Sequence, residues 1–105
     1  MALTIEANSI VVEMGDVKFV FSEPRSNDDP ELMKSNFIGY MLSKLLRVDG
    51  EIKEGNREIT ADDIKSRDVP FRLMQDLVSG FAIKIADYMG VSNKGSEEKN
   101  DSPSA

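Results

Sequence analysis

On both sides of the dipeptide Gly15-Asp16, every second residue is apolar. This alternation constrains the fold of the chain more than any other feature. A Gly-Asp pair favours a two-residue turn between antiparallel strands. One face of the resulting ribbon is apolar and pairs Met14 with Val17, Val12 with Phe19, and Ile10 with Phe21. On the other face, Glu13 pairs with Lys18 and Val11 with Val20. Because a one-residue slip would destroy both the apolar face and the ion pair, the sequence predicts an antiparallel hairpin with one buried face.

The stretch Asp68–Gly90 predicts the longest helix. Asp68 is a candidate N-cap, Pro70 suits the first turn, and Gly90 suits the stop. One stripe of the helical wheel carries Phe71, Met74, Val78, Phe81, Ile85 and Tyr88, widened by Leu73 and Leu77 on one side and by Ala82 and Met89 on the other. Ile83 breaks the pattern, because it falls on the polar face.

A second helix is predicted from Pro30 to about Arg47, with Asp29 as its N-cap. Its apolar residues cover more than half of the wheel, which exceeds the stripe of an ordinary surface helix. Met33, Phe37 and Met41 follow one another in steps of four residues and form one row. This row is either core under the first hairpin or a contact surface for another chain. Gly39 and Gly80, in the middle of the two helices, predict a close helix–helix approach.

The remaining segments are shorter. Leu3–Ala7 alternates and predicts a short strand. A second hairpin within Val48–Thr60 turns at Gly55-Asn56 and pairs Glu54 with Arg57, Lys53 with Glu58, and Ile52 with Ile59. We expect it to be exposed and mobile. Thr60 and Asp63 suggest a capping arrangement at the start of a short helix. The sequence thus predicts one α+β domain over residues 1–91, with a hairpin or meander packed on two main helices, and a disordered polar tail over residues 92–105.

Composition argues against several functions. The chain contains no His and no Cys, so it lacks the usual general base and the thiolate ligands of zinc sites. Neighbouring Asp62 and Asp63 fit helix capping better than catalysis, and Asp49-Gly50-Glu51 lacks the ligand spacing of a calcium loop. We therefore predict a protein without enzymatic activity, metal or cofactor. A net charge of -6 argues against nucleic acid and anionic membranes as partners. No signal peptide and no membrane span are recognised, and the lack of Cys is compatible with a reducing cytoplasm.

The order of segments resembles the small tail assembly chaperones of tailed bacteriophages and prophages. The resemblance covers roughly residues 48–85, where a Gly-bearing turn precedes I-T-x-x-D-I (residues 59–64) and a V-P helix start (residues 69–70). The strand with F-x-F-x-x-P (residues 19–24) in front fits as well. The resemblance implies a chaperone that binds the helical tape-measure protein or another tail protein in the bacterial cytoplasm. It also implies self-association into a homo-oligomer.

Two further hypotheses stay open at this stage. One is an acidic secretion-type chaperone or small adaptor protein, which would also act through protein–protein contacts. The other is an enzyme, which would need an acidic cluster converging on a pocket. No binding residue follows from the resemblance. The residues predicted to contact a partner therefore rest on the surplus of apolar helix surface, and they are Met33, Phe37, Met41 and Ile83.

Overall fold

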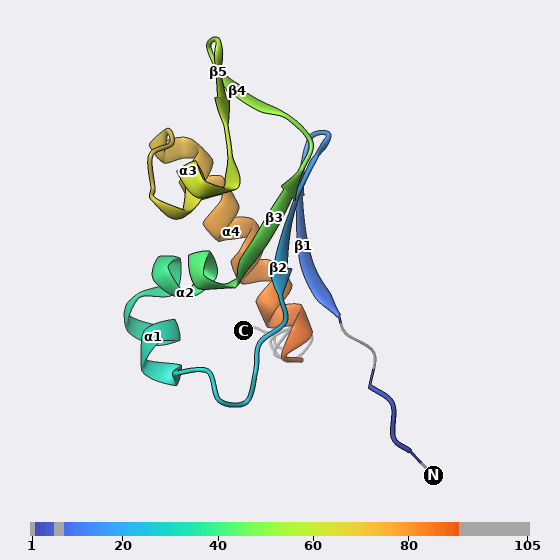
Figure 1. Ribbon diagram of the computed structural model, residues 1–105. Coiled ribbons are helices and arrows are strands. Elements are labelled where there is room, and N and C mark those ends of the chain that lie inside the picture. The colour runs from blue at the N-terminus through green and yellow to red at the C-terminus, as the bar shows by residue number, and fades with distance from the viewer. Residues whose placement is uncertain (1, 6–7, 91–105) are drawn as a thin grey trace, which may run out of the picture.

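The computed structural model of this protein describes residues 2–5 and 8–90. It has an α+β fold in which helices α1 to α4 lie on one side of a three-stranded antiparallel sheet (Figure 1). The sheet contains β1 (Ser9–Met14), β2 (Val17–Ser22) and β3 (Leu45–Asp49), in the order β1-β2-β3. A two-stranded sheet contains β4 (Ile52–Glu54) and β5 (Arg57–Ile59). The helices are α1 (Pro30–Ser35), α2 (Phe37–Lys44), α3 (Ala61–Lys65) and α4 (Phe71–Tyr88).

Both predicted hairpins are confirmed, with every expected pair in register. Their turns begin at Gly15 and Gly55, whose φ angles are +62° and +65°. A positive φ at the first turn position suits Gly, because a Cβ atom would strain that conformation. The second hairpin is anchored by Ile59, which is buried, and by Ile52, which is half-buried. Its mobility stays a prediction.

The single helix predicted from Pro30 to Arg47 is wrong. It is broken at Asn36, whose φ of -146° and ψ of 69° are not helical, and it ends at Lys44. Residues 45–49 form β3 instead and pair with the central strand β2. A short apolar run such as this one fits a helix and a buried strand equally well by periodicity. The strand is favoured because β2 would otherwise have an open edge, and pairing with β3 gives its backbone N–H and C=O groups hydrogen-bond partners.

The pairing of β2 with β3 contains a β-bulge. Val20 lies opposite Arg47 and Phe21 lies opposite Leu45, so Leu46 is an extra residue on β3. The side chain of Leu46 is exposed. β3 is an edge strand of its sheet, and a bulge increases the local twist of the strand that carries it.

The core lies between the three-stranded sheet and the helices, and Phe81 of α4 is at its centre. The ring of Phe81 lies 4.7 Å from that of Phe21, 5.6 Å from that of Phe37 and 6.3 Å from that of Tyr40, measured between ring centroids. Such tilted aromatic contacts stabilise a core beyond the area that they bury. They fix α4 against both β2 and α2.

The two mid-helix glycines do not mark a helix–helix contact, which corrects the prediction. Gly80 faces a strand, and a Cβ atom there would lie 2.7 Å from Cγ1 of Val12 on β1. At Gly39 a Cβ atom would lie 2.6 Å from the side chain of Asn36, the N-cap of its own helix. Gly80 therefore permits close helix–sheet packing, whereas Gly39 makes room for a cap.

The predicted helix ends are partly confirmed. Asp29 caps α1, Thr60 and Asp63 form a capping box at α3, and Gly90 has a φ of +73°. Asp68 does not cap α4, because α4 starts at Phe71 without a side-chain cap. The carboxylate of Asp68 contacts Arg57 instead.

The chain ends are described only in part. Residues 3–5 lie outside the strands, so the strand predicted over Leu3–Ala7 is not formed there, and residues 6–7 lie outside the described residues. Figure 1 shows residues 2–5 leading away from the body of the protein. The predicted tail over residues 92–105 also lies outside the described residues.

Candidate functional site

An apolar groove between α2 and α4 is the strongest candidate for a functional site. It has a volume of about 250 Å³ and is lined by Ile38, Phe71, Met74, Gln75, Val78 and Ser79. None of these six residues is charged, although 30% of the chain is. Phe71 is 75% exposed, which makes it the most exposed aromatic residue of the described chain. A large exposed aromatic side chain beside an apolar groove is typical of a protein-binding surface.

The apolar surface continues along α4 beyond this groove. Val78, Ala82 and Met89 follow Phe71 at steps of seven, four and seven residues, so all four lie on the same side of the helix. Ala82 is exposed and Met89 is 44% exposed. At a rise of 1.5 Å per residue, this apolar side is about 27 Å long. Its length suits a second helix better than a small molecule.

The core contacts of α4 set the orientation of this side. The residues that α4 buries against the sheet are Met74, Leu77, Phe81 and Ile85. Around the axis of α4, the buried residues are centred closer to Leu77 than the predicted stripe is. Phe71, at the other margin of that stripe, therefore lies outside the core. The close approach of Gly80 to Val12 prevents a compensating shift of the helix, because α4 already touches β1 there.

The opposite wall of the groove depends on the start of α2. The Asn36 side chain accepts a hydrogen bond from the Gly39 N–H at 3.0 Å, and the Asn36 N–H donates to the Leu32 carbonyl at 2.9 Å. Asn36 thus ends α1 and begins α2 at the same residue. The break directs Phe37 toward Phe81 and leaves Ile38 half-buried at the groove.

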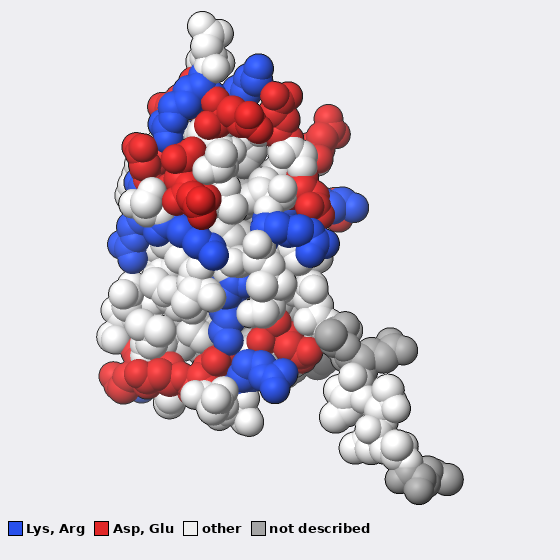
Figure 2. Space-filling view, viewed as in Figure 1, with Lys and Arg blue, Asp and Glu red and all other residues white. Residues whose placement is uncertain are grey.

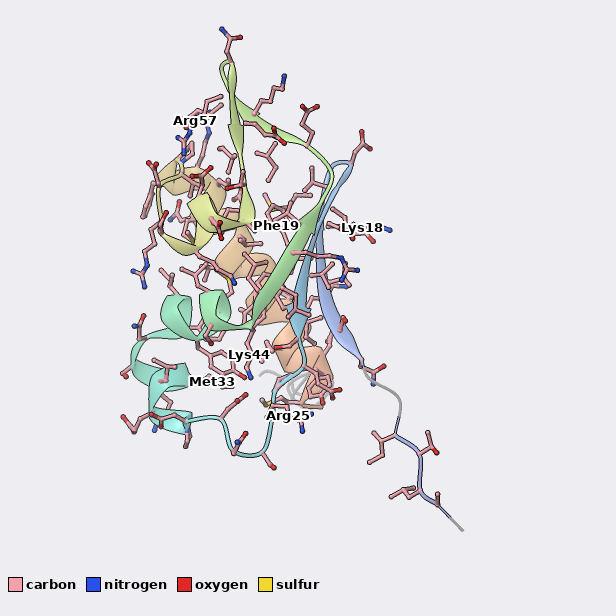
Figure 3. The ribbon with its side chains drawn as sticks, in the orientation of Figure 1. Lys18, Phe19, Arg25, Met33, Lys44 and Arg57 are labelled. Carbon is pink, nitrogen blue, oxygen red and sulfur yellow. The ribbon has the colours of Figure 1, made fainter. Side chains whose placement is uncertain are left out.

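Asp28 fastens the far end of α2 to the loop that follows β2. Its carboxylate accepts hydrogen bonds from the Tyr40 hydroxyl, the Lys44 ammonium and the Arg25 N–H, each at 2.8 Å. Lys44 also lies 5.6 Å from the centroid of the Tyr40 ring, and Figure 3 shows it at the same end of the molecule as Arg25. Desolvation acts to raise the pKa of Asp28, but the hydrogen bonds from Lys44, the Arg25 N–H and Tyr40 outweigh it and lower that pKa. Burial, followed by the bond to Asp28, raises the pKa of Tyr40.

A second polar contact joins the last turn of α4 to the start of β1. The Tyr88 hydroxyl donates to Glu23, and the Asn8 N–H donates to the same carboxylate at 3.1 Å. The bonds from Tyr88 and Asn8, in that order, lower the pKa of Glu23. The N-terminal segment therefore leaves the body of the protein beside the C-terminal end of α4.

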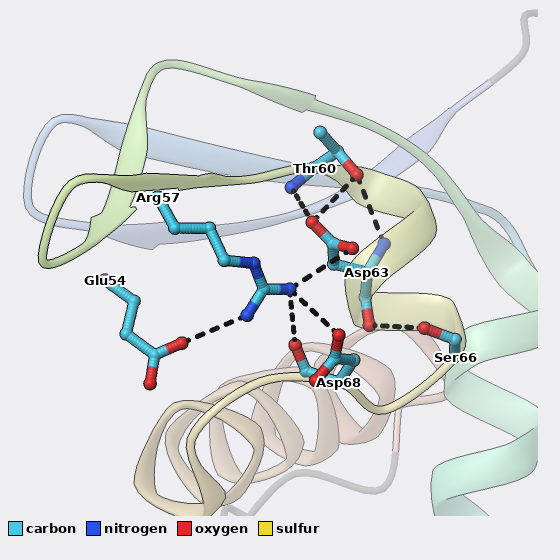
Figure 4. A network of polar contacts seen from close by, with 6 residues as sticks. All are labelled: Glu54, Arg57, Thr60, Asp63, Ser66 and Asp68. Carbon is cyan, nitrogen blue, oxygen red and sulfur yellow. Dashed lines mark hydrogen bonds and ion pairs between the residues drawn. The ribbon is translucent and has the colours of Figure 1, made fainter.

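Arg57 organises the opposite end of the molecule (Figure 4). Its guanidinium contacts Glu54 at 3.3 Å, Asp63 at 3.3 Å and Asp68 at 3.1 Å, and it also donates to the Asp68 carbonyl at 3.1 Å. The pKa of Asp63 is lowered, first by the bond from the Thr60 N–H and also by Arg57. One arginine thus joins the second hairpin, α3 and the start of α4, which explains why Asp68 does not cap α4.

The structure separates the four residues predicted to contact a partner. Met41 is fully buried and belongs to the core. Phe37 is half-buried and stacks on Tyr40 at 6.4 Å between ring centroids. Met33 is half-buried on α1 (Figure 3), and the break at Asn36 places it on a different helix from the other two. The predicted row therefore does not exist as one surface. Ile83 is 64% exposed, about a third of a turn around α4 from Phe71.

Sequence reasoning named Phe71 and Val78 only as members of the predicted core stripe, and it missed the groove. The width of that stripe was the sequence feature that pointed to the groove. One small sheet cannot cover an apolar stripe that is broadened on both sides, so part of it must stay exposed. On the face that Figure 2 shows, uncharged atoms lie over α2, between charged side chains at the end with the second hairpin and a further charged group at the opposite end.

The described residues contain no group of three acidic residues arranged to hold a metal ion. Asp62 is exposed, whereas Asp63 is engaged in the capping box and by Arg57, so the two carboxylates do not converge on one pocket. Within the described part of the chain, no helix is both long enough and apolar enough to cross a membrane. Comparisons with protein-family models, with curated proteins and with solved structures find no match.

Proposed function

We propose that this protein is a non-enzymatic assembly chaperone that binds an apolar helical segment of a client protein in the groove between α2 and α4. The observation that carries the proposal is Phe71, a large aromatic side chain that is 75% exposed at one end of an uncharged groove. Burying such a side chain favours association by about 1.5–3 kcal/mol. An exposed apolar patch of this kind, with polar residues around it, is typical of a protein interaction site.

The shape of the surface supports a helical client. The apolar side of α4 runs for about 27 Å, and Ile38 of α2 forms a wall beside its first half. A helix laid along this side would place residues of its own apolar stripe against Phe71, Val78 and Ala82 in turn. Binding of an amphipathic helix in an apolar groove is a recurrent mode of protein recognition.

The resemblance to tail assembly chaperones names the client. In that function the client is the long helical tape-measure protein of a tailed bacteriophage or prophage, and binding takes place in the bacterial cytoplasm. The net charge of -6 would keep a complex of chaperone and apolar client soluble. The groove would cover apolar helix surface on the client until assembly buries it.

The test is affinity capture of the tagged protein from its native cells, with and without prophage induction, read by mass spectrometry. The wild-type protein is expected to recover one very long helical tail protein after induction. Phe71→Asp is expected to lose it, and Leu46→Asp, which alters an exposed apolar residue on β3 and away from α4, is expected to retain it. Recovery of a secreted effector or a regulator instead would favour the secretion-type chaperone or adaptor.

A stability control makes the capture result interpretable. Because Phe71 is exposed and Phe81 is fully buried on the same helix, Phe71→Ala should change the free energy of unfolding by less than about 0.5 kcal/mol. Phe81→Ala should lower it by about 3–5 kcal/mol. A large loss with Phe71→Ala would mean that Phe71 supports the fold, and the proposed site would then be wrong.

A further inference from the structure

The N-terminal segment Ala2–Ile5, which we call the arm, carries two large apolar side chains in water. Leu3 is 86% exposed and Ile5 is 80% exposed, more than any other large apolar residue of the described chain. The arm contains no charged side chain. Figure 1 shows it leading away from the sheet and from α2. A single exposed leucine is ordinary, but two such residues on four uncharged positions form an apolar segment without a partner among the described residues of its own chain.

The arm and the groove between α2 and α4 match in chemistry and in spacing. All six residues that line the groove are uncharged, so an uncharged arm can enter it without burying an ionised group. Side chains two residues apart in an extended chain lie on one side, about 7 Å from each other. This distance is close to the spacing of Met74 and Val78, which are about 6 Å apart along the axis of α4.

The arm of one chain is too short to occupy the whole groove of that same chain. Asn8 is held beside Tyr88, at the C-terminal end of α4, through the Glu23 carboxylate. Along α4, the nearest groove residue, Ser79, is about 14 Å from Tyr88, and Phe71 is about 25 Å from it. From Asn8 a fully extended chain reaches about 11 Å at Ile5 and about 18 Å at Leu3. The two side chains therefore cannot both enter the groove, and neither reaches Phe71.

We propose that two copies of this protein exchange arms, so that Leu3 and Ile5 of each copy occupy the groove between α2 and α4 of the other. Such an exchange closes at two copies, because each copy inserts its arm into the groove of the same copy whose arm it receives. The interface is small, and the dimer is expected to be weak, with a dissociation constant of about micromolar or higher. The dimer rests on the arm and groove alone.

Exchange of arms would also regulate the groove, and this consequence rests on the proposed function. In the dimer, the arms cover the surface that the client would use. A client helix then competes with the arm, and dilution of the protein or removal of the arm increases the share of open grooves. Self-association and client binding are mutually exclusive at each groove.

Sedimentation velocity over a wide range of protein concentrations tests the exchange. The wild-type protein should shift from monomer to dimer as the concentration rises. Leu3→Asp combined with Ile5→Asp should weaken self-association by roughly ten-thousandfold or more, because the dimer buries two aliphatic side chains from each arm and each favours association at least about tenfold. Phe71→Asp should weaken it as well, and the matched surface change Leu46→Asp on β3 should leave it unchanged.

Mixing the two defective variants gives the sharper result. The arm variant keeps its groove, and Phe71→Asp keeps its arm, so a mixed pair can form one of the two contacts. The mixture should contain more dimer than either variant alone. A dimer of unchanged strength in the arm variant would overturn the proposal, and so would a wild-type protein that stays monomeric at every concentration. Both altered sites are exposed, so the variants are expected to fold.

Binding of the apolar dye ANS separates this inference from the proposed function. At concentrations where the wild-type protein is a dimer, the arm variant should bind several-fold more dye than wild type, because its grooves are open. Phe71→Asp should bind less dye than the arm variant. If the exchange is found but no tail protein is captured, the proposed function fails and the dimer stands. If a tail protein is captured by a protein that is always monomeric, the dimer fails and the function stands.

Discussion

Gly80 of α4 lies so close to Val12 of β1 that a Cβ atom on Gly80 would come within 2.7 Å of Val12 Cγ1. Val12 is buried in the sheet and has a branched, stiff side chain. The helix therefore cannot accept even a methyl group at this point without moving. This contact sets the distance between α4 and the sheet, and with it the position of the groove.

Gly80→Ala is predicted to destabilise the protein, although Ala favours helices by about 1 kcal/mol over Gly. The expected loss is about 1–3 kcal/mol, the usual cost of overpacking a core. Urea denaturation measures it. Combining Gly80→Ala with Val12→Ala should recover part of the loss, because the second change removes the clashing methyl group. Purely additive effects of the two changes would contradict the clash.

Met41 and Ile83, both predicted to contact a partner, should behave oppositely in a stability measurement. Met41→Ala removes a fully buried side chain and should lower the free energy of unfolding by about 2–5 kcal/mol. Ile83→Ala alters an exposed side chain and should change it by less than about 0.5 kcal/mol. Thermal or chemical denaturation of the two variants side by side is sufficient. Equal effects would mean that the burial described for α2 or α4 is wrong.

Asn36→Ala removes the side-chain acceptor that caps α2, and it should cost about 1 kcal/mol. The matched control is Asn36→Asp, which keeps an oxygen at the same position and should preserve stability. The change is also expected to reduce protection of the Gly39 N–H from hydrogen exchange, since that group loses its partner. Unaltered exchange at Gly39 would show that the cap is dispensable.

The acid sensitivity of the protein should depend on Asp28, whose pKa is lowered in the folded state. A carboxylate with a lowered pKa stabilises the fold above its unfolded pKa of about 4 and loses this contribution as the pH falls through its folded pKa. Asp28→Asn should therefore be less stable than wild type near pH 7, and the difference should shrink below about pH 4.

Chemical denaturation of both proteins at a series of pH values provides the measurement for Asp28. Asp76→Asn, on the exposed side of α4, is the matched control for the loss of one surface charge. A gap between wild type and Asp28→Asn that stays constant from neutral to acid pH would rule out the contribution of the Asp28 carboxylate.

Replacing Arg67 with glycine is predicted to stabilise the protein. It follows α3 with a φ of +67°, and it is the one non-glycine residue of the described chain with a positive φ. Because a Cβ atom strains this conformation, Arg67→Gly is expected to raise the free energy of unfolding by about 0.5–1 kcal/mol. Arg67→Ala keeps the Cβ atom and should give no such gain. Thermal denaturation separates the two results.

Much of the fold could be predicted because local chemistry determines it. Two-residue turns at Gly15 and Gly55 and the alternation around them fix both hairpin registers. The identity of β3 could not be predicted, since an apolar run directly after a helix continues its pattern until a neighbouring strand competes for it. That competitor, β2, lies more than twenty residues earlier in the chain.

The groove was harder to predict than the fold. The helical wheel places Phe71 and Phe81 on one stripe, but only the packed structure shows that Phe81 meets Phe21 while Phe71 meets water. Periodicity reports which residues share a side of a helix, and it does not report how far the neighbouring elements extend over that side. The sequence therefore indicated surplus apolar surface, but the prediction that Met41 belongs to that surface was wrong, because Met41 is buried.

The bulge at Leu46 has a consequence for the protein at high concentration. An open sheet edge with a straight row of N–H and C=O groups invites strands of other molecules to add one after another, as in fibrils. On β3 the extra residue interrupts that row and twists it. Open-ended growth of a continuous sheet is thereby obstructed at this edge, so the molecule can present apolar side chains to partners while its backbone discourages polymerisation there.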